Sequence, residues 1–312
     1  MTERSSSSTL RGILWMIVTG LMFVGVTSLV KYLGPDMPAA EAAFLRYALG
    51  LVLLVPMLGS VFKSDFSQPL MRLFVYRGAA HVGAVFLWFF AMARIPLADV
   101  TAMNYLSPIY VTLGAALFLG EKLALRRVIA VGIALVGALI ILRPGIRSVD
   151  MGHLAMLLAA VFFACSYLLT KRLSDQVSAG TIVVMLSLFV TVGLAPMAWM
   201  VWVPPSTNDL LILFGVACFA TLGHYTMTLA FAAAPVNITQ PVTFLQLVWA
   251  VSVGMVFFDE PLDPWVVIGG GTILASVSFI SWREAVLQRR LRTPPSSCYK
   301  SLGFYLLEAL TE

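Results

Sequence analysis

Apolar residues along the chain gather into ten runs separated by short polar segments. The connections are brief and contain turn formers such as Gly34-Pro35-Asp36, which leaves no room for an extramembrane domain. A helix needs about 20 apolar residues to cross the hydrocarbon core of a bilayer. The pattern therefore predicts an all-α integral membrane protein with ten transmembrane helices. These spans lie near residues 11–30, 41–60, 74–93, 97–119, 128–142, 152–170, 181–203, 210–232, 236–258 and 265–282.

The composition supports the same fold class. Of the 312 residues, 60% are apolar and 11% are charged, whereas soluble globular proteins have about 25% charged residues. A soluble or disordered chain is therefore excluded. The net charge of +5 does not indicate a nucleic-acid partner, because basic residues collect in the cytoplasmic loops of membrane proteins. The three cysteines lack metal-ligand spacing, and no cofactor or metal is expected.

The distribution of Lys and Arg predicts the orientation. With the N-terminus inside, fourteen basic residues fall in inside segments and four in outside loops. Arg72 and Arg77 are counted here with the inside segment that precedes the third span. Positive charge favours the cytoplasmic side, so we expect a multi-pass membrane protein with both termini in the cytoplasm.

The two halves of the chain repeat each other. Each half holds five spans, an odd number, so the second copy must enter the membrane from the opposite side. Inverted repeats of this kind are typical of secondary transporters. The expected organisation is a cytoplasmic tail (1–10), a first repeat (11–145), a second repeat (150–284) and a cytoplasmic tail (285–312). The matched pairs are Gly12/Gly152, Lys31/Lys171, Leu33/Leu173 and Pro56/Pro196 at one offset, and Pro96/Pro235, Glu121/Glu260, Leu123/Leu262 and Gly132/Gly271 at an offset one residue shorter.

Three motifs resemble the drug/metabolite transporter superfamily, specifically its EamA-type ten-helix members. They are Phe44-Leu-Arg46, the segment from Ser107-Pro108 to Phe118-Leu-Gly-Glu121-Lys-Leu, and Phe257-Phe258-Asp-Glu260-Pro261-Leu. The second copy departs from the pattern, because Leu247 stands where the first copy has Pro108. Gln246-Leu-Val-Trp249-Ala is similar to the branch that contains bacterial riboflavin uptake transporters. The resemblance implies a carrier built from two five-helix units.

Polar residues in the fourth and ninth spans are the first candidates for a substrate site. They recur at i, i+3, i+4 and i+7, which places each set on one helix face. Polar groups in a bilayer usually face the bundle interior or a water-filled cavity, although interhelical hydrogen bonds that only hold the bundle together are the alternative. The two sets are Thr101, Asn104, Tyr105 and Pro108, and Asn237, Gln240, Pro241 and Phe244.

Aromatic and ionisable residues extend this site. Trp88 and Trp249 are candidate aromatic walls. His81 and His224 could be neutral hydrogen-bonding groups or take part in proton coupling. Arg46 lies inside the second span and needs a counter-charge from another helix, for which Asp99 is a candidate. Arg46 could be a structural anchor or contact the substrate.

The expected substrate follows from the same residues. Few fixed charges are expected in the interior, which favours a neutral or zwitterionic organic molecule with a planar part. Riboflavin uptake by alternating access is the leading hypothesis, and export of amino acids, drugs or other metabolites is the alternative. An intramembrane enzyme is a distant alternative, because no Asp or Glu lies at helical spacing from His81 or His224. The partners are then a small-molecule substrate and the lipid bilayer, and a homodimer is left open.

Three further features predict structure. Small residues at Ala130, Ala134 and Ala138, and at Gly271 and Ala275, allow spans five and ten to pack closely. Glu121 and Glu260 end their helices at the membrane surface, where a Lys or Arg could pair with them. The tail from 293 to 312 is either a short interfacial helix or disordered, and its removal should leave transport intact.

Overall fold

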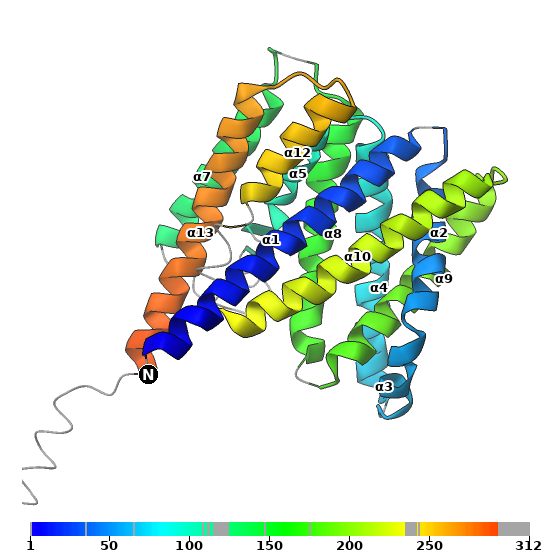
Figure 1. Cartoon of the computed structure of the whole chain (residues 1–312), viewed down its shortest axis with the longest axis horizontal. Coiled ribbons are helices and arrows are strands. Elements are labelled where there is room, and N and C mark those ends of the chain that lie inside the picture. The colour runs from blue at the N-terminus through cyan, green and yellow to red at the C-terminus, as the bar shows by residue number, and fades with distance from the viewer. Residues whose placement is uncertain are drawn as a thin grey trace, which may run out of the picture.

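The computed structural model describes residues 2–34, 36–64, 66–107, 109–110, 113–114, 125–146, 148–174, 176–234, 242 and 244–292. These residues form helices joined by short connections, as the hydrophobic pattern predicts (Figure 1). The tail beyond residue 292 lies outside the described residues, so the prediction for it stays a prediction. The first half contains α1 (Thr2–Leu33), α2 (Ala39–Leu53), η1 (Val55–Met57), α3 (Leu58–Phe62), α4 (Gln68–Met92), α5 (Leu97–Asn104) and α7 (Leu125–Leu142). The second half contains α8 (Met151–Ser174), α9 (Ala179–Met200), α10 (Thr207–Ala233), α12 (Phe244–Phe257) and α13 (Pro264–Arg292).

Local sequence explains where several helices begin. Ser67, Ser178 and Ser206 each accept a hydrogen bond from a backbone N–H in the first turn of α4, α9 and α10. Such caps satisfy donors that have no partner within the helix. At α10 the side chain of Asp209 also accepts from the Ser206 backbone, which completes a capping box. Polar residues between apolar runs thus fix the helix starts.

Within the described ranges, five helices are long and apolar enough to cross a membrane by themselves: α1, α4, α8, α9 and α10. Shorter apolar helices occupy Val128–Leu142, Leu245–Phe257 and Pro264–Ile280. The second predicted span is not one straight helix. It is broken between α2 and the η1–α3 segment, with a bend of 60°, and Pro56 lies in the break, where its missing N–H cannot continue the helix. With α5 these segments account for the ten predicted spans.

The contacts between helices obey the symmetry of an inverted repeat. The most extensive pairings are α1 with α10 and α4 with α8. Exchanging the first half for the second turns one of these pairs into the other, because α1 corresponds to α8 and α4 to α10. The pairs α2 with α9, α5 with α12 and α7 with α13 each map onto themselves. In Figure 1, α1 and α10 run side by side across the front.

Two close contacts repeat this symmetry at the level of single residues. A Cβ added to Gly12, in the first half of α1, would clash with the Cβ of Ala234. A Cβ added to Gly152 at the start of α8 would lie 2.8 Å from the Cγ2 of Ile95. Gly12 and Gly152 are matched repeat positions, and Ile95 and Ala234 each directly precede a matched proline. The two contacts lie in the first halves of α1 and α8, at opposite ends of the bundle.

The predicted packing of spans five and ten is confirmed. Ala130, Ala134 and Ala138 of α7 are buried, and the hydroxyl of Ser276 in α13 donates to the backbone oxygen of Ala130. The backbones approach most closely at two glycines that the sequence analysis did not single out. A Cβ on Gly137 would lie 2.8 Å from the Gly269 oxygen, and one on Gly269 would lie 2.6 Å from the Gly137 oxygen.

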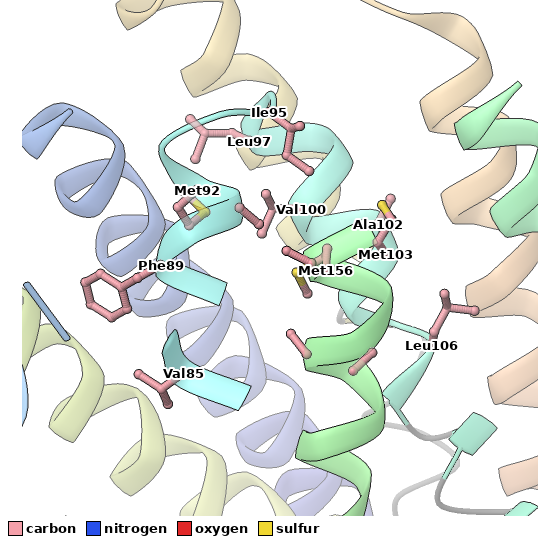
Figure 2. Packing of buried hydrophobic residues seen from close by; sticks show 14 of the residues in the cluster. Val85, Phe89, Met92, Ile95, Leu97, Val100, Ala102, Met103, Leu106 and Met156 are labelled. Carbon is pink, nitrogen blue, oxygen red and sulfur yellow. The ribbon is translucent and has the colours of Figure 1, made fainter. Parts of the chain in front are cut away.

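The apolar core joins α4, α5 and α8. Met92, Leu97, Val100 and Met103 are fully buried and meet Met156 of α8 (Figure 2). A methionine fills irregular space between helices because its side chain is flexible and unbranched. This core fixes α5 against the second repeat.

Acidic residues tie the loops together at the end of the bundle where α1 terminates, which we call the Lys31 end. Lys31 Nζ lies 2.9 Å from Glu260 Oε1 and also donates to the Ile95 oxygen. The contact with Lys31 confirms the predicted pairing of Glu260 with a basic residue. The Glu260 carboxylate also accepts from the Leu97 N–H. His153 Nε2 lies 2.8 Å from Asp99 Oδ2, and Arg143 pairs with Asp263.

Candidate substrate-binding site

Basic side chains from α2, α4 and α10 gather inside the bundle. We call Arg46, Arg77, His81 and His224 the basic cluster. His81 lies within electrostatic range of the other three members, and His224 within range of both arginines. The cluster therefore joins the first repeat to the second.

Arg77 is the most deeply placed charge of the cluster. It is 6% exposed, and its guanidinium donates from Nη1 to the Ile182 backbone oxygen of α9 at 2.9 Å. Its Nε has no hydrogen-bond partner among the described residues. Leu70, Phe74 and Leu173 belong to a second, smaller apolar core formed where α4 begins and α8 ends. Arg77 lies on α4 between this small core and His81.

Arg46 is half-buried and stacks on its neighbour. Its Cζ lies 4.0 Å from the centroid of the Tyr47 ring, a favourable position for a cation over an aromatic face. Asp99 is not its counter-charge, as the sequence analysis had suggested, because Asp99 pairs with His153 at the Lys31 end. In the described part of the chain no carboxylate forms an ion pair with Arg46 or Arg77.

His81 holds the first repeat to the second. Its Nε2 lies 3.0 Å from the Tyr47 hydroxyl, and its Nδ1 lies 3.1 Å from the Ser166 hydroxyl of α8. Both ring nitrogens are therefore engaged, in agreement with the hydrogen-bonding role considered for His81. The ring also meets Phe163 edge-on at 5.4 Å. These contacts fix Tyr47, and with it the ring on which Arg46 stacks.

Two exposed side chains lie near Arg77. Tyr167 of α8 is 48% exposed, and His224 of α10 is also exposed. Both lie within electrostatic range of Arg77. His224 further meets Phe23 of α1 edge-on at 5.3 Å.

The predicted polar face of the fourth span is described only in part. Thr101 is buried and its hydroxyl donates to the Leu97 oxygen of its own helix. Asn104 and Tyr105 are half-buried, and the Tyr105 hydroxyl bonds the Leu247 backbone of α12. Tyr105 thus links the two symmetry-related helices. Pro108, Asn237, Gln240 and Pro241 lie outside the described residues, and of Phe244 only the helical backbone is described.

The two predicted tryptophans lie on different helices. Trp88 is half-buried on α4 and meets Phe89 edge-on at 5.3 Å. Trp249 of α12 lies against α1, because a Cβ on Gly20 would lie 2.8 Å from its Cζ3 atom. Trp249 therefore lies between α12 and α1, and neither tryptophan has a contact with the basic cluster among those described. The assignment of both as aromatic walls of a substrate site stays a prediction.

Sequence reasoning missed Arg77, Tyr47, Ser166 and Tyr167. Arg77 had been counted as a residue of the cytoplasmic segment, which is wrong, because α4 begins at Gln68 and buries Arg77. The premise that few fixed charges lie in the interior is corrected with it. One signal was available: an arginine inside an apolar run is expensive in a bilayer and marks a functional site by default.

Comparison with known proteins identifies the family. The model of the EamA-like transporter family matches this chain twice, over residues 10–143 and 150–282. The chain belongs to the EamA-like transporter family. The two matches cover almost the same segments as the two repeats read from the sequence. The chain is therefore a membrane transporter made of two copies of one unit.

Relatives within the EamA-like family carry different names. The chain is 31% identical to a riboflavin transporter of Vibrio cholerae, over 91% of this chain and 97% of the relative. It is 29% identical to a pseudopaline exporter of Pseudomonas aeruginosa, over 86% and 95%. It is 22% identical to an S-adenosylmethionine uptake transporter of Rickettsia prowazekii, over 88% and 94%. A solved structure with a TM-score of 0.58 and 17% identity covers 88% of this chain and 98% of its own, and it shows the same fold.

Proposed function

We propose that this protein is a secondary transporter that moves a small organic metabolite across the bacterial inner membrane by alternating access, with both termini in the cytoplasm. The observation that carries the proposal is the exchange symmetry of the helix contacts around the basic cluster. Two similar halves that face each other can rock about a central site and expose it to one side at a time. The sealed Lys31 end supports a structure with one closed gate.

Riboflavin import is the first candidate activity. Two riboflavin transporters, from Vibrio cholerae and Rhizobium johnstonii, are 31% and 30% identical over most of this chain. Half-buried aromatic residues such as Trp88 and Trp249 suit a planar ring system.

The test is uptake of labelled riboflavin by bacterial cells that neither make nor import the vitamin. Expression of this chain should raise uptake well above the empty vector and support growth on low riboflavin. A matched control is the same chain with His81→Leu, which removes both hydrogen bonds of the imidazole ring. Background uptake by a protein that is present in the membrane at normal level would exclude riboflavin.

Transport of an organic anion is the second candidate, and a specific observation favours it. Arg46 and Arg77 lie inside the bundle, and among the described residues neither forms an ion pair with a carboxylate. A relative that is named as an exporter of another metabolite shows that the family is not restricted to riboflavin. Uptake of a labelled organic anion into inside-out membrane vesicles distinguishes export from import, because an exporter moves its substrate into the lumen of such vesicles.

A further inference from the structure

We infer that the basic cluster binds an oxyanion group of the substrate, a carboxylate or a phosphate, between the guanidinium groups of Arg46 and Arg77. This inference rests on the proposed transport function and names the chemical class of the substrate. It favours the second candidate over riboflavin, which carries no such group.

The first argument is that no carboxylate in the described part of the chain forms an ion pair with Arg46 or Arg77. Two arginines and two histidines share one region of the bundle. Like charges repel strongly where the dielectric constant is low, and a buried charge is costly unless it is paired. Polar groups of this kind inside a membrane protein persist where they serve a pathway or a ligand. An anionic ligand would supply the missing countercharge.

The second argument is that nearby acids are already engaged elsewhere. Glu41, on the same helix as Arg46, is fully buried; its Oε2 accepts from the Val203 backbone N–H at 2.9 Å, while its Oε1 has no hydrogen-bond partner among the described residues. Asp99 pairs with His153, and Glu260 pairs with Lys31. These carboxylates close the Lys31 end, and none of them is paired with the cluster in the described part of the chain.

The third argument is geometric. Arg77 is anchored by its Nη1 to the Ile182 oxygen while its Nε remains unpaired among the described residues. The Cζ of Arg46 lies 4.0 Å from the centroid of the Tyr47 ring, and the Tyr47 hydroxyl is bonded to His81. Planar guanidinium groups match carboxylate and phosphate oxygens, often through two parallel hydrogen bonds. Both guanidinium groups are thus positioned before a ligand binds.

The test compares probes that differ by one anionic group. The purified full-length protein in detergent is titrated with nicotinate and nicotinamide, and with flavin mononucleotide and riboflavin. The first pair isolates a carboxylate and the second a phosphate. In at least one pair the anionic member should bind about tenfold more tightly or better, which corresponds to one well-placed ion pair. Equal affinity within both pairs, or no binding by either anion, would overturn the inference.

Variants locate the preference. Arg46→Gln and Arg77→Gln should each abolish the preference for the anion, and Arg46→Lys should keep part of it. The matched control is Arg94→Gln: Arg94 also stacks on an aromatic ring, that of Phe90 at 3.6 Å, but is exposed at the end of α4. The Arg94→Gln protein should bind both members of each probe pair with the affinities of the wild type. An anion preference that is undiminished in a folded Arg46→Gln protein would refute the site, even if Arg77→Gln does not fold.

Transport is measured separately, so that the two proposals can fail independently. Proteoliposomes loaded with the preferred anion are tested for exchange with labelled anion outside. Anion binding without exchange would leave the site standing and contradict the proposed transport function. Exchange of riboflavin without any preference for anions would support the proposed transport function and contradict the anion site.

Discussion

Glu260 combines two tasks at the scale of a single residue. Its carboxylate pairs with Lys31 of α1 and also accepts from the Leu97 N–H that begins α5. The Lys31 and Glu260 side chains are 20% and 12% exposed, so solvent screens the pair weakly. One side chain from the second repeat therefore holds two helices of the first.

Replacing Glu260 should separate these two tasks. Glu260→Gln removes the charge but keeps an oxygen that can accept from Leu97, whereas Glu260→Ala leaves both Lys31 and the Leu97 N–H without this partner. We expect Glu260→Ala to lower the free energy of unfolding by about 1–3 kcal/mol, and Glu260→Gln by less. Denaturant unfolding in detergent measures both. Equal losses in the two variants would show that the hydrogen bond to Leu97 contributes nothing.

The candidate site residues show how far sequence reasoning reaches. His81, His224 and Arg46 were singled out because polar groups stand out in apolar runs, and their role in transport stays a prediction. Arg77 was assigned to the wrong environment, because a charge near the end of a run looks like a boundary until the start of the helix is known. Tyr47 and Ser166 are unremarkable in sequence, and their role follows from contacts with His81 across helices.

At the scale of elements, apolar runs determine the helices but not their shape. Pro56 coincides with a 60° break between α2 and α3, whereas its repeat partner Pro196 lies inside the continuous helix α9. The same residue type thus has different effects, since the outcome depends on neighbouring helices that the local sequence does not specify. The close approach of α7 and α13 was predictable from small residues, although the glycines that permit it were not the ones first noted.

Two glycines of α7 give a matched test of that approach. A Cβ at Gly137 would lie 2.8 Å from the Gly269 oxygen, whereas a Cβ at Gly132 meets nothing within 4 Å. Gly137→Ala should therefore force α7 and α13 apart and destabilise the protein by about 1–3 kcal/mol. Gly132→Ala should be neutral or stabilising by about 0.5–1 kcal/mol, because alanine favours a helix over glycine. Thermal unfolding compares the two, and equal melting temperatures would contradict the described contact.

At the scale of the whole molecule, the inverted repeat makes the two ends of the bundle equivalent in construction. Gly12 against Ala234 and Gly152 against Ile95 are corresponding contacts at opposite ends. The repeat likewise maps Lys31 onto Lys171 and Glu260 onto Glu121. In this conformation Lys31 and Glu260 are paired, while Glu121 lies outside the described residues.

A transporter that alternates must close one end as it opens the other, which predicts opposite effects for the two lysines. Lys31→Glu places like charges at the Lys31 end and should hold that end open. Lys171→Glu should do the same at the opposite end, because the repeat makes Lys171 and Glu121 the counterparts of Lys31 and Glu260. The measurement is labelling of Tyr167→Cys, in a background without Cys165, Cys218 and Cys298, by a membrane-impermeant maleimide added to either side. Lys31→Glu should raise labelling from one side and Lys171→Glu from the other, and reversing the partner charge with Glu260→Lys or Glu121→Lys should restore each. If both lysine changes act on the same side, the two ends are not equivalent gates, and alternation between symmetric halves is wrong.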